Sequence, residues 1–213
     1  MSSIHLEILD KKRKEVFGRL KAFKKKGYLA GGTALALQIR HRYSFDFDIF
    51  LDREVQKKDY LLLKKYFTVK EVGPNTSEQL SIITKDEIGI TLVFYPYKPL
   101  FSPIKTESLP LSFYKDIMVD KAFTIGRRAT WRDYVDMFWL LREKYISLSE
   151  TIELAKKKFQ EEFNEKLFLE QLVYFNDLRK FDVQFVKQKY FKDTIKKHLI
   201  EEVKEYQSKI NLT

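Results

Sequence analysis

The sequence LAGGTALALQIRHRYSFDFDIFL, which covers residues 29–51, decides the fold of the first half of the chain. Residues 44–51 alternate between apolar and polar side chains, which is the two-residue period of a β-strand. The two faces of this predicted strand carry Phe45, Phe47, Ile49 and Leu51, and Ser44, Asp46 and Asp48. Two carboxylates on one face repel each other unless a cation lies between them, and Mg²⁺ prefers oxygen ligands. Asp46 and Asp48 are therefore candidate metal ligands, although a bare Asp-x-Asp pattern also fits a solvated strand face.

A pair of glycines precedes this strand, between a short apolar stretch at 28–30 and a predicted helix at 33–40. Glycine lets a phosphate approach the backbone, and the first turn of a helix offers N–H groups without a partner inside the helix. The hydroxyl of Thr33 adds a donor. Most Gly-Gly pairs are simply turns, but Gly31, Gly32 and Thr33 so close to Asp46 and Asp48 predict a phosphate cradle beside a metal site.

The rest of the chain divides into a mixed half and a helical half. Periodicity predicts helices at 5–26, ended by Gly27, and at 60–67, and strands at 68–72, 80–84 and 89–97. After the prolines at 96, 99, 103 and 110, it predicts helices at 113–125 and 131–144, a helix opened by Ser149, and helical structure to residue 209. We therefore expect an α/β domain at 1–110 and a helical domain at 111–213.

The composition limits the kind of protein. The 213 residues carry a net charge of +10, which favours a polyanionic partner, nucleic acid or a nucleotide, over lysines that serve solubility alone. The absence of cysteine excludes disulfides, thiolate zinc sites and a cysteine nucleophile. We expect a cytoplasmic protein without membrane association, because the N-terminal segment lacks the apolar core of a secretory signal and no apolar run approaches the ~20 residues of a membrane span.

The segment from Leu29 to Phe50 resembles the AbiEii/AbiGii family of nucleotidyltransferase toxins, in the DNA polymerase β-like superfamily, whose signature is Gly-Gly or Gly-Ser, a spacer and Asp-x-Asp. Residues 116–121 resemble the family's Asp-x-x-x-x-Lys helix. The pair Arg127-Arg128 resembles its arginine turn, and residues 132–136 resemble its Arg-Asp-x-x-Asp segment. The resemblance covers about residues 28–142, and the last third of the chain has no matching motif.

This resemblance implies an α+β fold, in which a polymerase β-like mixed sheet with flanking helices is followed by a C-terminal helical bundle. It implies transfer of a nucleoside monophosphate from an NTP to an acceptor, with RNA such as tRNA as the acceptor. It also implies the toxin of a type IV toxin–antitoxin or phage-defence system, with a cognate antitoxin as partner. The implied cofactor is Mg²⁺ or Mn²⁺, held by Asp46 and Asp48.

Further residues acquire expected roles from the same resemblance. Lys121 would neutralise the phosphates, Asp116 would contact the ribose or a base edge, and Arg127 and Arg128 would reach phosphate. We also expect Arg42, in a basic loop at 40–42, to lie near the triphosphate, and Ser44 either to donate a hydrogen bond beside the metal or only to start the strand.

Structural roles compete with these assignments in the helical half. Lys121 can be one more surface lysine, and Asp116 and Asp120, four residues apart, can form salt bridges on their helix. The spacing of Arg132 and Asp136 suits an ion pair, for which we favour a structural role that fixes the turn at 126–128. Apolar residues of the following helix are expected in its core, namely Trp131, Phe138, Trp139 and Leu141.

One departure from the family pattern bears on activity. Polymerase β-like enzymes usually carry a third carboxylate on a neighbouring strand, but the candidate strand at 88–94 holds no acid, and Thr91 or its neighbour takes that position. A catalytically silent member that binds nucleotide or a protein partner is therefore an alternative. A second alternative, a plain nucleic-acid-binding protein, leaves Asp46 and Asp48 unexplained.

Overall fold

The computed structural model describes residues 4–128, 130–178, 180 and 182–210. The chain forms two compact units, residues 1–113 and 114–213. The first contains the sheet and the second is helical in its regular structure, so the expected α+β class, a mixed sheet with helices followed by a helical part, is confirmed.

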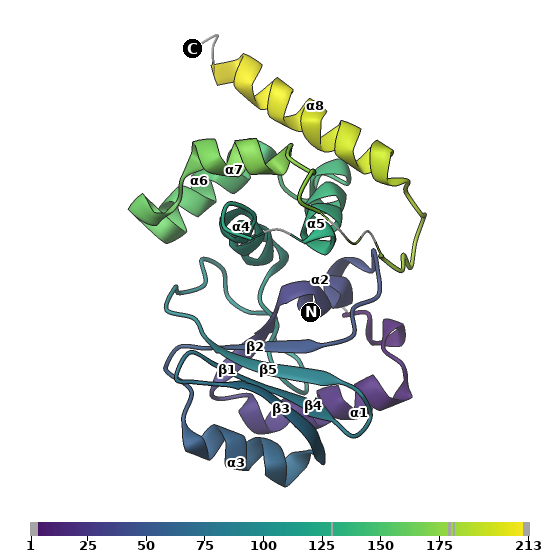
Figure 1. The fold of residues 1–213 in the computed structure, drawn as a ribbon, viewed down its shortest axis with the longest axis vertical. Coiled ribbons are helices and arrows are strands. Elements are labelled where there is room, and N and C mark those ends of the chain that lie inside the picture. Colours follow the sequence, from purple (N-terminus) through teal and green to yellow (C-terminus); the bar gives the residue numbers. More distant parts are fainter. Residues whose placement is uncertain (1–3, 129, 179, 181, 211–213) are drawn as a thin grey trace. The chain divides into compact units, whose positions relative to one another are not determined.

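The centre of the first unit is a mixed sheet with the strand order β1-β2-β5-β4-β3 (Figure 1). The strands are β1 (Gly27–Ala30), β2 (Phe47–Leu51), β3 (Val69–Asn75), β4 (Gln79–Thr84) and β5 (Gly89–Phe94). Strands β2 and β5 are parallel, and the other neighbours are antiparallel. The helices α1 (Lys11–Arg19) and α3 (Lys57–Tyr66) cover one face, and α2 (Gly31–Ile39) lies on the opposite face (Figure 1).

Strand β2 keeps the alternation expected from the sequence, but over a shorter range. Its residues Phe47, Ile49 and Leu51 are buried, and Phe47 stacks on Phe17 of α1 with ring centroids 6.3 Å apart. The predicted start at residue 44 is wrong, because residues 44–46 precede the strand. Phe45 is 38% exposed, and the guanidinium of Arg13 lies 4.9 Å from its ring centroid.

The predicted helix at 5–26 is also wrong as a single element. A 3₁₀ turn at Leu6–Ile8 is separated from α1 by Asp10, whose side chain accepts a hydrogen bond from the backbone N–H of Arg13 and so caps a new helix. A second 3₁₀ turn, Leu20–Phe23, follows α1. Gly27, expected to end a helix, is instead the first residue of β1.

The second unit consists of helices α4 (Tyr114–Ile125), α5 (Trp131–Arg142), α6 (Leu148–Phe159), α7 (Glu165–Leu172) and α8 (Lys192–Ile210). The expected core residues of α5 are buried: Trp131, Phe138, Trp139 and Leu141. Two expectations fail here. The capping residue of α6 is Ser147 instead of Ser149, and the described residues between α7 and α8 form no helix. In the part of the chain that the structure describes, no helix combines the length and apolarity needed to cross a bilayer.

Candidate active site

The corner between β1 and α2 brings the first glycine against β2, the second strand of the sheet. Ala30, the last residue of β1, pairs with Asp48 on β2, and α2 starts at the next residue. Gly31 has φ +65°, which a residue with a Cβ adopts only with strain. A Cβ built on Gly31 would lie 2.8 Å from Oδ2 of Asp48. The Asp48 carboxylate therefore lies directly against the backbone at the start of α2.

The second glycine, Gly32, leaves room for the guanidinium of Arg42 and the hydroxyl of Ser44. A Cβ on Gly32 would lie 2.5 Å from Nη2 of Arg42 and 3.0 Å from Oγ of Ser44. Arg42 is 2% exposed and donates a hydrogen bond to the carbonyl of Tyr43 at 2.9 Å. Of the basic loop expected at 40–42, Arg40 is exposed, whereas the buried Arg42 guanidinium lies at the glycine corner. Gly31, Gly32, Arg42, Ser44 and Asp48 all meet there.

A hydrogen bond links the side chain of Thr33 to the backbone of Asp46. The hydroxyl of Thr33, which is 1% exposed, donates a hydrogen bond to the carbonyl oxygen of Asp46. The exposed Asp46 side chain accepts a hydrogen bond from the backbone N–H of Gly89 at 3.2 Å, and a Cβ on Gly89 would lie 2.8 Å from the same oxygen. Thr33 therefore holds the residue that carries one carboxylate, and β5 orients that carboxylate.

A row of hydroxyl groups crosses the sheet beside Asp48. Thr91 of β5 is the register partner of Asp48, and Ser81 of β4 is the register partner of Thr91. Ser81 donates to Thr91 with an oxygen–oxygen distance of 3.2 Å, and the Gln79 amide donates to Ser81 at 2.9 Å. A threonine hydroxyl thus occupies the strand position beside Asp48. Gln79 and Ser81 were missed from the sequence, although the alternation at 79–84 places them on one strand face.

The carboxylates of Asp46 and Asp48 fit a divalent metal whose coordination shell is completed by other ligands. Among the described residues, no group of three or more Asp, Glu or His side chains could hold a metal ion. Asp46 and Asp48 offer two carboxylates, and Mg²⁺ commonly takes one or two carboxylates and completes its shell with water and phosphate oxygens. The chain's own donors therefore fit a divalent cation whose remaining ligands are water or phosphate oxygens.

In the second unit, Lys121 lies within a buried ion-pair cluster. Its Nζ lies 2.7 Å from Asp133 and 2.7 Å from Asp136, which joins α4 to α5. Burial raises the pKa of Asp133, but the charge and hydrogen bond of Lys121 and the hydroxyl of Thr130 outweigh it, so this pKa lies below its ordinary value. Asp136, expected to pair with Arg132, pairs with Lys121.

Asp116 belongs to a second cluster of the same kind. The Nζ of Lys158, on α6, lies 3.0 Å from Asp116 and 2.6 Å from Asp120. The Lys158 side chain is 1% exposed, and nothing in the sequence distinguishes this buried lysine from the two others in its run of three. Asp116 and Asp120 follow the salt-bridge alternative, with a lysine from another helix as the partner.

The two arginines at the end of α4 are on the surface. The guanidinium of Arg127 lies 3.7 Å from the ring centroid of Phe123 and 3.7 Å from Glu162, and Arg128 is exposed. Their contact with phosphate stays a prediction.

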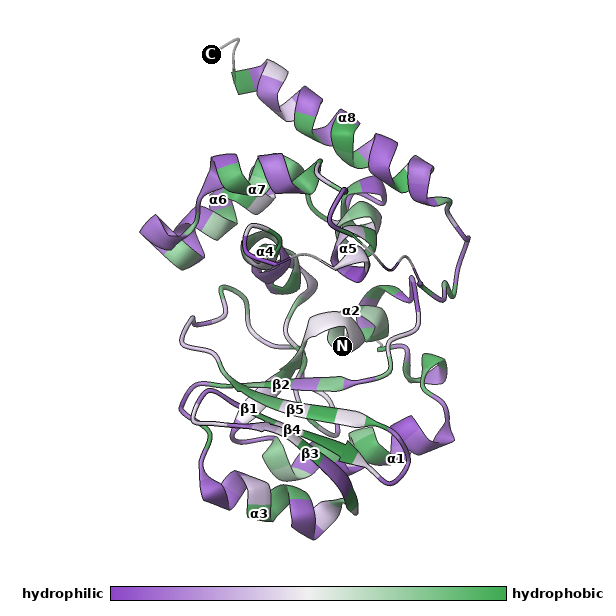
Figure 2. Cartoon of the chain, in the orientation of Figure 1, coloured by the Kyte–Doolittle hydropathy of each residue, from purple (hydrophilic) through white to green (hydrophobic). Residues whose placement is uncertain are grey.

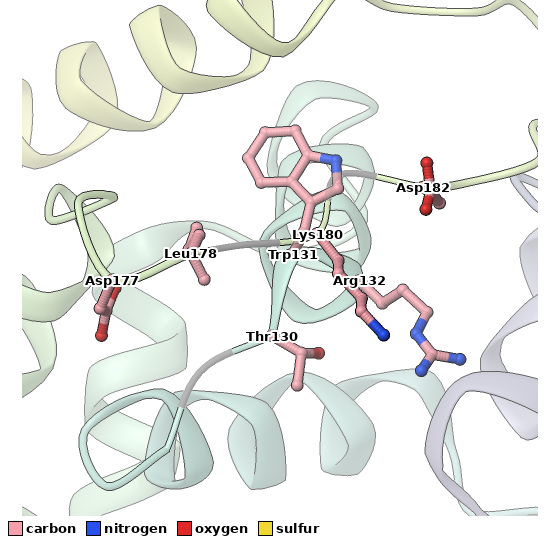
Figure 3. A pocket seen from close by; sticks show the side chains of 7 residues that line it. All are labelled: Thr130, Trp131, Arg132, Asp177, Leu178, Lys180 and Asp182. Atoms are coloured by element: carbon pink, nitrogen blue, oxygen red, sulfur yellow. The ribbon is translucent and has the colours of Figure 1, made fainter.

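A cavity of about 510 Å³ lies in the second unit (Figure 3). Its charged lining residues are balanced, with Arg132 and Lys180 against Asp177 and Asp182, and Trp131 and Leu178 supply apolar surface. This lining has no excess charge that would select a nucleotide.

Comparison with known proteins gives a relative and a fold. No family model matches the sequence. The uncharacterized protein aq_aa25 of Aquifex aeolicus (strain VF5) is 30% identical over 181 residues, which cover 81% of this chain and 87% of that protein. The chain belongs to the family of this Aquifex protein.

Two solved structures with a similar fold are described as nucleotidyltransferases. A proposed nucleotidyltransferase from Helicobacter pylori matches with a TM-score of 0.59 and 15% identity, over 95% of this chain and 98% of that one. MenT4, a nucleotidyltransferase toxin from Mycobacterium tuberculosis H37Rv, matches with a TM-score of 0.59 and 13% identity, over 90% of this chain and 80% of that one. The chain therefore has the nucleotidyltransferase fold.

Proposed function

We propose that this chain is a divalent-metal-dependent nucleotidyltransferase that transfers a nucleoside monophosphate from an NTP to RNA. The position of the Asp48 carboxylate against Gly31, in the first turn of α2, is the observation that supports this function most. The first-turn N–H groups suit an anion, and α2 starts without a side-chain cap because its N-cap residue is Ala30. A carboxylate for the cation and a helix N-terminus for the phosphates thus lie at one corner.

Each candidate site residue of the first unit then has a defined part in the proposed reaction. Asp46 and Asp48 would hold Mg²⁺ or Mn²⁺, which neutralises developing charge on the phosphates and on the departing pyrophosphate. The α2 backbone and Arg42 would hold the phosphates, and Ser44 lies close enough to Gly32 to contribute a hydroxyl. The acceptor oxygen bonds to the α-phosphorus, the bond to pyrophosphate breaks, and the acceptor proton passes to water. Thr33 keeps Asp46 at a fixed distance from α2.

The roles expected for the second unit stay predictions. Contacts of Lys121, Arg127 and Arg128 with phosphate, and of Asp116 with ribose or base, are not needed for the site of the first unit. Lys121 and Asp116 have ion-pair partners within the second unit, so we assign the metal and the phosphate cradle to residues 31–48 alone.

The biological setting is inferred from the sequence motifs and from one neighbour. The AbiEii/AbiGii-like motifs and the nucleotidyltransferase toxin MenT4 support a toxin of a type IV toxin–antitoxin or phage-defence system, neutralised by a cognate antitoxin in the cytoplasm. The charge of +10 supports an RNA acceptor such as tRNA.

Transfer of labelled nucleotide tests the proposal. Purified protein is incubated with α-labelled NTPs, Mg²⁺ and total RNA, and RNA is examined for label. We expect label with the natural protein and with Asp52→Ala, an exposed aspartate just beyond β2, but none with Asp46→Ala or Asp48→Ala. Label that persists in both of these variants contradicts the metal assignment.

A catalytically silent member of the fold is the second candidate, favoured by Thr91 beside Asp48 where a third carboxylate would be expected. It predicts Mg²⁺-dependent NTP binding, lost in Asp48→Ala, without label in RNA. Growth arrest on expression that Asp48→Ala relieves would support the active toxin instead.

A further inference from the structure

A basic groove of about 390 Å³ lies in the first unit, between α1 and the turn that joins β4 to β5. Four of its lining residues are cationic, Lys11, Lys12, Arg19 and Lys85, and two are anionic, Glu15 and Asp86. Figure 1 shows α1 beneath the sheet, alongside this turn. We propose that this groove holds the phosphodiester backbone of the single-stranded end of the acceptor RNA, which rests on the proposed transferase function.

The charge of the surrounding surface favours a polyanion. Residues 11–26 contain nine basic residues and a single acid, and most of α1 is hydrophilic in Figure 2. Residues 1–113 contain 20 basic and 13 acidic residues, so they carry seven of the ten net positive charges of the chain. The cavity of the second unit, by contrast, has a balanced lining. Lysines that served solubility alone would not need to line a concave surface together.

The spacing of the cations suits a strand of nucleic acid. Lys11, Glu15 and Arg19 lie four residues apart, so they share one face of α1. Eight residues of helix extend for about 12 Å, so Lys11 and Arg19 place two cations about 12 Å apart along one wall, with Glu15 between them. Asp86 of the opposite wall forms an ion pair with Lys12 of α1 at 3.1 Å, and its neighbour Lys85 is exposed.

Two contacts of residues close in sequence to the groove involve Asp46 or the residue before it. Arg13, next to the groove residue Lys12, donates from its side chain to the carbonyl of Phe45 at 3.1 Å, one residue before Asp46. From the other wall, the turn at Lys85–Asp86 leads into Gly89, whose N–H donates to the Asp46 carboxylate.

Binding of RNA without nucleotide or metal tests the groove by itself. The probe is a 12-nucleotide single-stranded RNA with a 5′ fluorescein, followed by anisotropy over a series of salt concentrations. The variant Lys11→Glu/Lys85→Glu reverses one charge on each wall. An acidic residue in the first turn of α1 is compatible with the helix dipole, so this variant is expected to fold. The matched control is Lys57→Glu/Lys58→Glu, two exposed lysines at the start of α3.

We expect the groove variant to bind RNA at least tenfold more weakly at ~0.1 M salt. The slope of log affinity against log salt concentration should become shallower by about 1.4, because two phosphate contacts are lost and each contributes about 0.7 for a single strand. The control should stay within about twofold of the natural protein. Equal weakening in both variants, or no binding by the natural protein at low salt, would overturn the proposal.

Kinetics separate this proposal from the proposed function. If the natural protein labels RNA, the groove variant should raise KM for RNA and leave kcat unchanged, whereas Asp48→Asn should lower kcat and retain RNA affinity. A protein that binds RNA through the groove but transfers no label would overturn the transferase function and leave the groove supported. A groove variant with unchanged KM would overturn the groove and leave the transferase intact.

Discussion

Aspartate pairs in the two units of the chain have opposite surroundings. In the second unit, Asp116 and Asp120 share Lys158, and Asp133 and Asp136 share Lys121, with every nitrogen–oxygen distance at or below 3.0 Å. On β2 of the first unit and just before it, the carboxylates lie against glycine residues, Asp46 against Gly89 and Asp48 against Gly31.

Under the proposed function, this difference separates carboxylates that hold the fold together from carboxylates that bind a metal. A buried carboxylate pays a desolvation penalty that a lysine at hydrogen-bond distance offsets, so it is committed to the fold. The exposed Asp46 and the half-buried Asp48 retain access to solvent, and glycines exclude side chains from the space beside them. Pairs of aspartates two to four residues apart thus serve packing in one unit and form a candidate active site in the other.

The largest effect on stability is expected from Lys158→Met. Removal of the shared lysine leaves Asp116 and Asp120 without their ion-pair partner in a buried position, and loss of one member of a buried pair costs about 3–5 kcal/mol. Both tryptophans of the chain, Trp131 and Trp139, lie on α5. Urea unfolding followed by tryptophan fluorescence therefore reports on the second unit.

Lys157→Met is the control, because Lys157 is exposed on the same helix. It should change the free energy of unfolding by less than about 0.5 kcal/mol. The triple change Asp116→Asn, Asp120→Asn and Lys158→Met should recover part of the loss. If Lys158→Met and Lys157→Met were equally stable, the cluster would not be structural, and the contrast with β2 would disappear.

Much of the fold could be predicted from local pattern, because strands and long helices depend on periodicity. The alternation at 47–51 and the helices at 114–125 and 131–142 follow it closely. The errors lie where a single polar contact overrides periodicity. Asp10 caps α1 in the middle of an apparently continuous helix, and Ser147 takes the cap that Ser149 would also have suited.

The site could be predicted in part for a different reason. Gly31, Gly32, Asp46 and Asp48 are close in sequence, so a strand–helix–strand unit places them together whatever the rest of the chain does. Side chains that reach an aspartate from a distant segment cannot be identified from local sequence spacing. Lys158 pairs with a helix about 40 residues away, and Thr91 reaches Asp48 only through the parallel β2–β5 pairing.

A smaller effect, and one that depends on pH, is expected from Asp133→Asn. The folded-state pKa of Asp133 lies below its ordinary value of 3.8, so its ionised form stabilises the fold above that pH, and the contribution is lost as the pH falls through the folded-state pKa. Loss of charge-assisted hydrogen bonds costs about 1.5–3 kcal/mol. In urea unfolding, the free energy of unfolding of the variant should be lower than that of the natural protein by this amount at pH 7. The difference should become smaller as the pH falls below 4. Asp193→Asn, an exposed first-turn residue of α8, should show a small gap at both pH values.

Gly31→Ala should lower the free energy of unfolding by less than Asp133→Asn does, but it should change the candidate active site more. A Cβ at φ +65° costs about 1–2 kcal/mol, and this one would push the Asp48 carboxylate from a position 2.8 Å away. We expect a lower melting temperature by circular dichroism and at least a tenfold loss of nucleotide transfer.

Gly18→Ala is the control. Gly18 lies within α1, and nothing lies within 4 Å of a Cβ built on it. That variant should be up to about 1 kcal/mol more stable. Equal activity in the two variants would place the reaction away from the glycine corner.

The smallest effect is expected from Thr91→Asp, and it tests whether the β2 pair binds a cation at all. The introduced carboxylate would lie at the register position opposite Asp48, and like charges on neighbouring strands cost up to about 1 kcal/mol. Without divalent cation this variant should therefore melt below Thr91→Asn, which has the same shape and no charge. If Asp48 is a metal ligand, added Mg²⁺ should bind the new carboxylate as well and raise the melting temperature of Thr91→Asp towards or above that of Thr91→Asn, because binding to the folded state alone stabilises it. A deficit that Mg²⁺ leaves unchanged would mean that Asp48 lies beside Thr91 as an ordinary surface carboxylate. The contrast between the two units would then be one of solvent exposure and not of function.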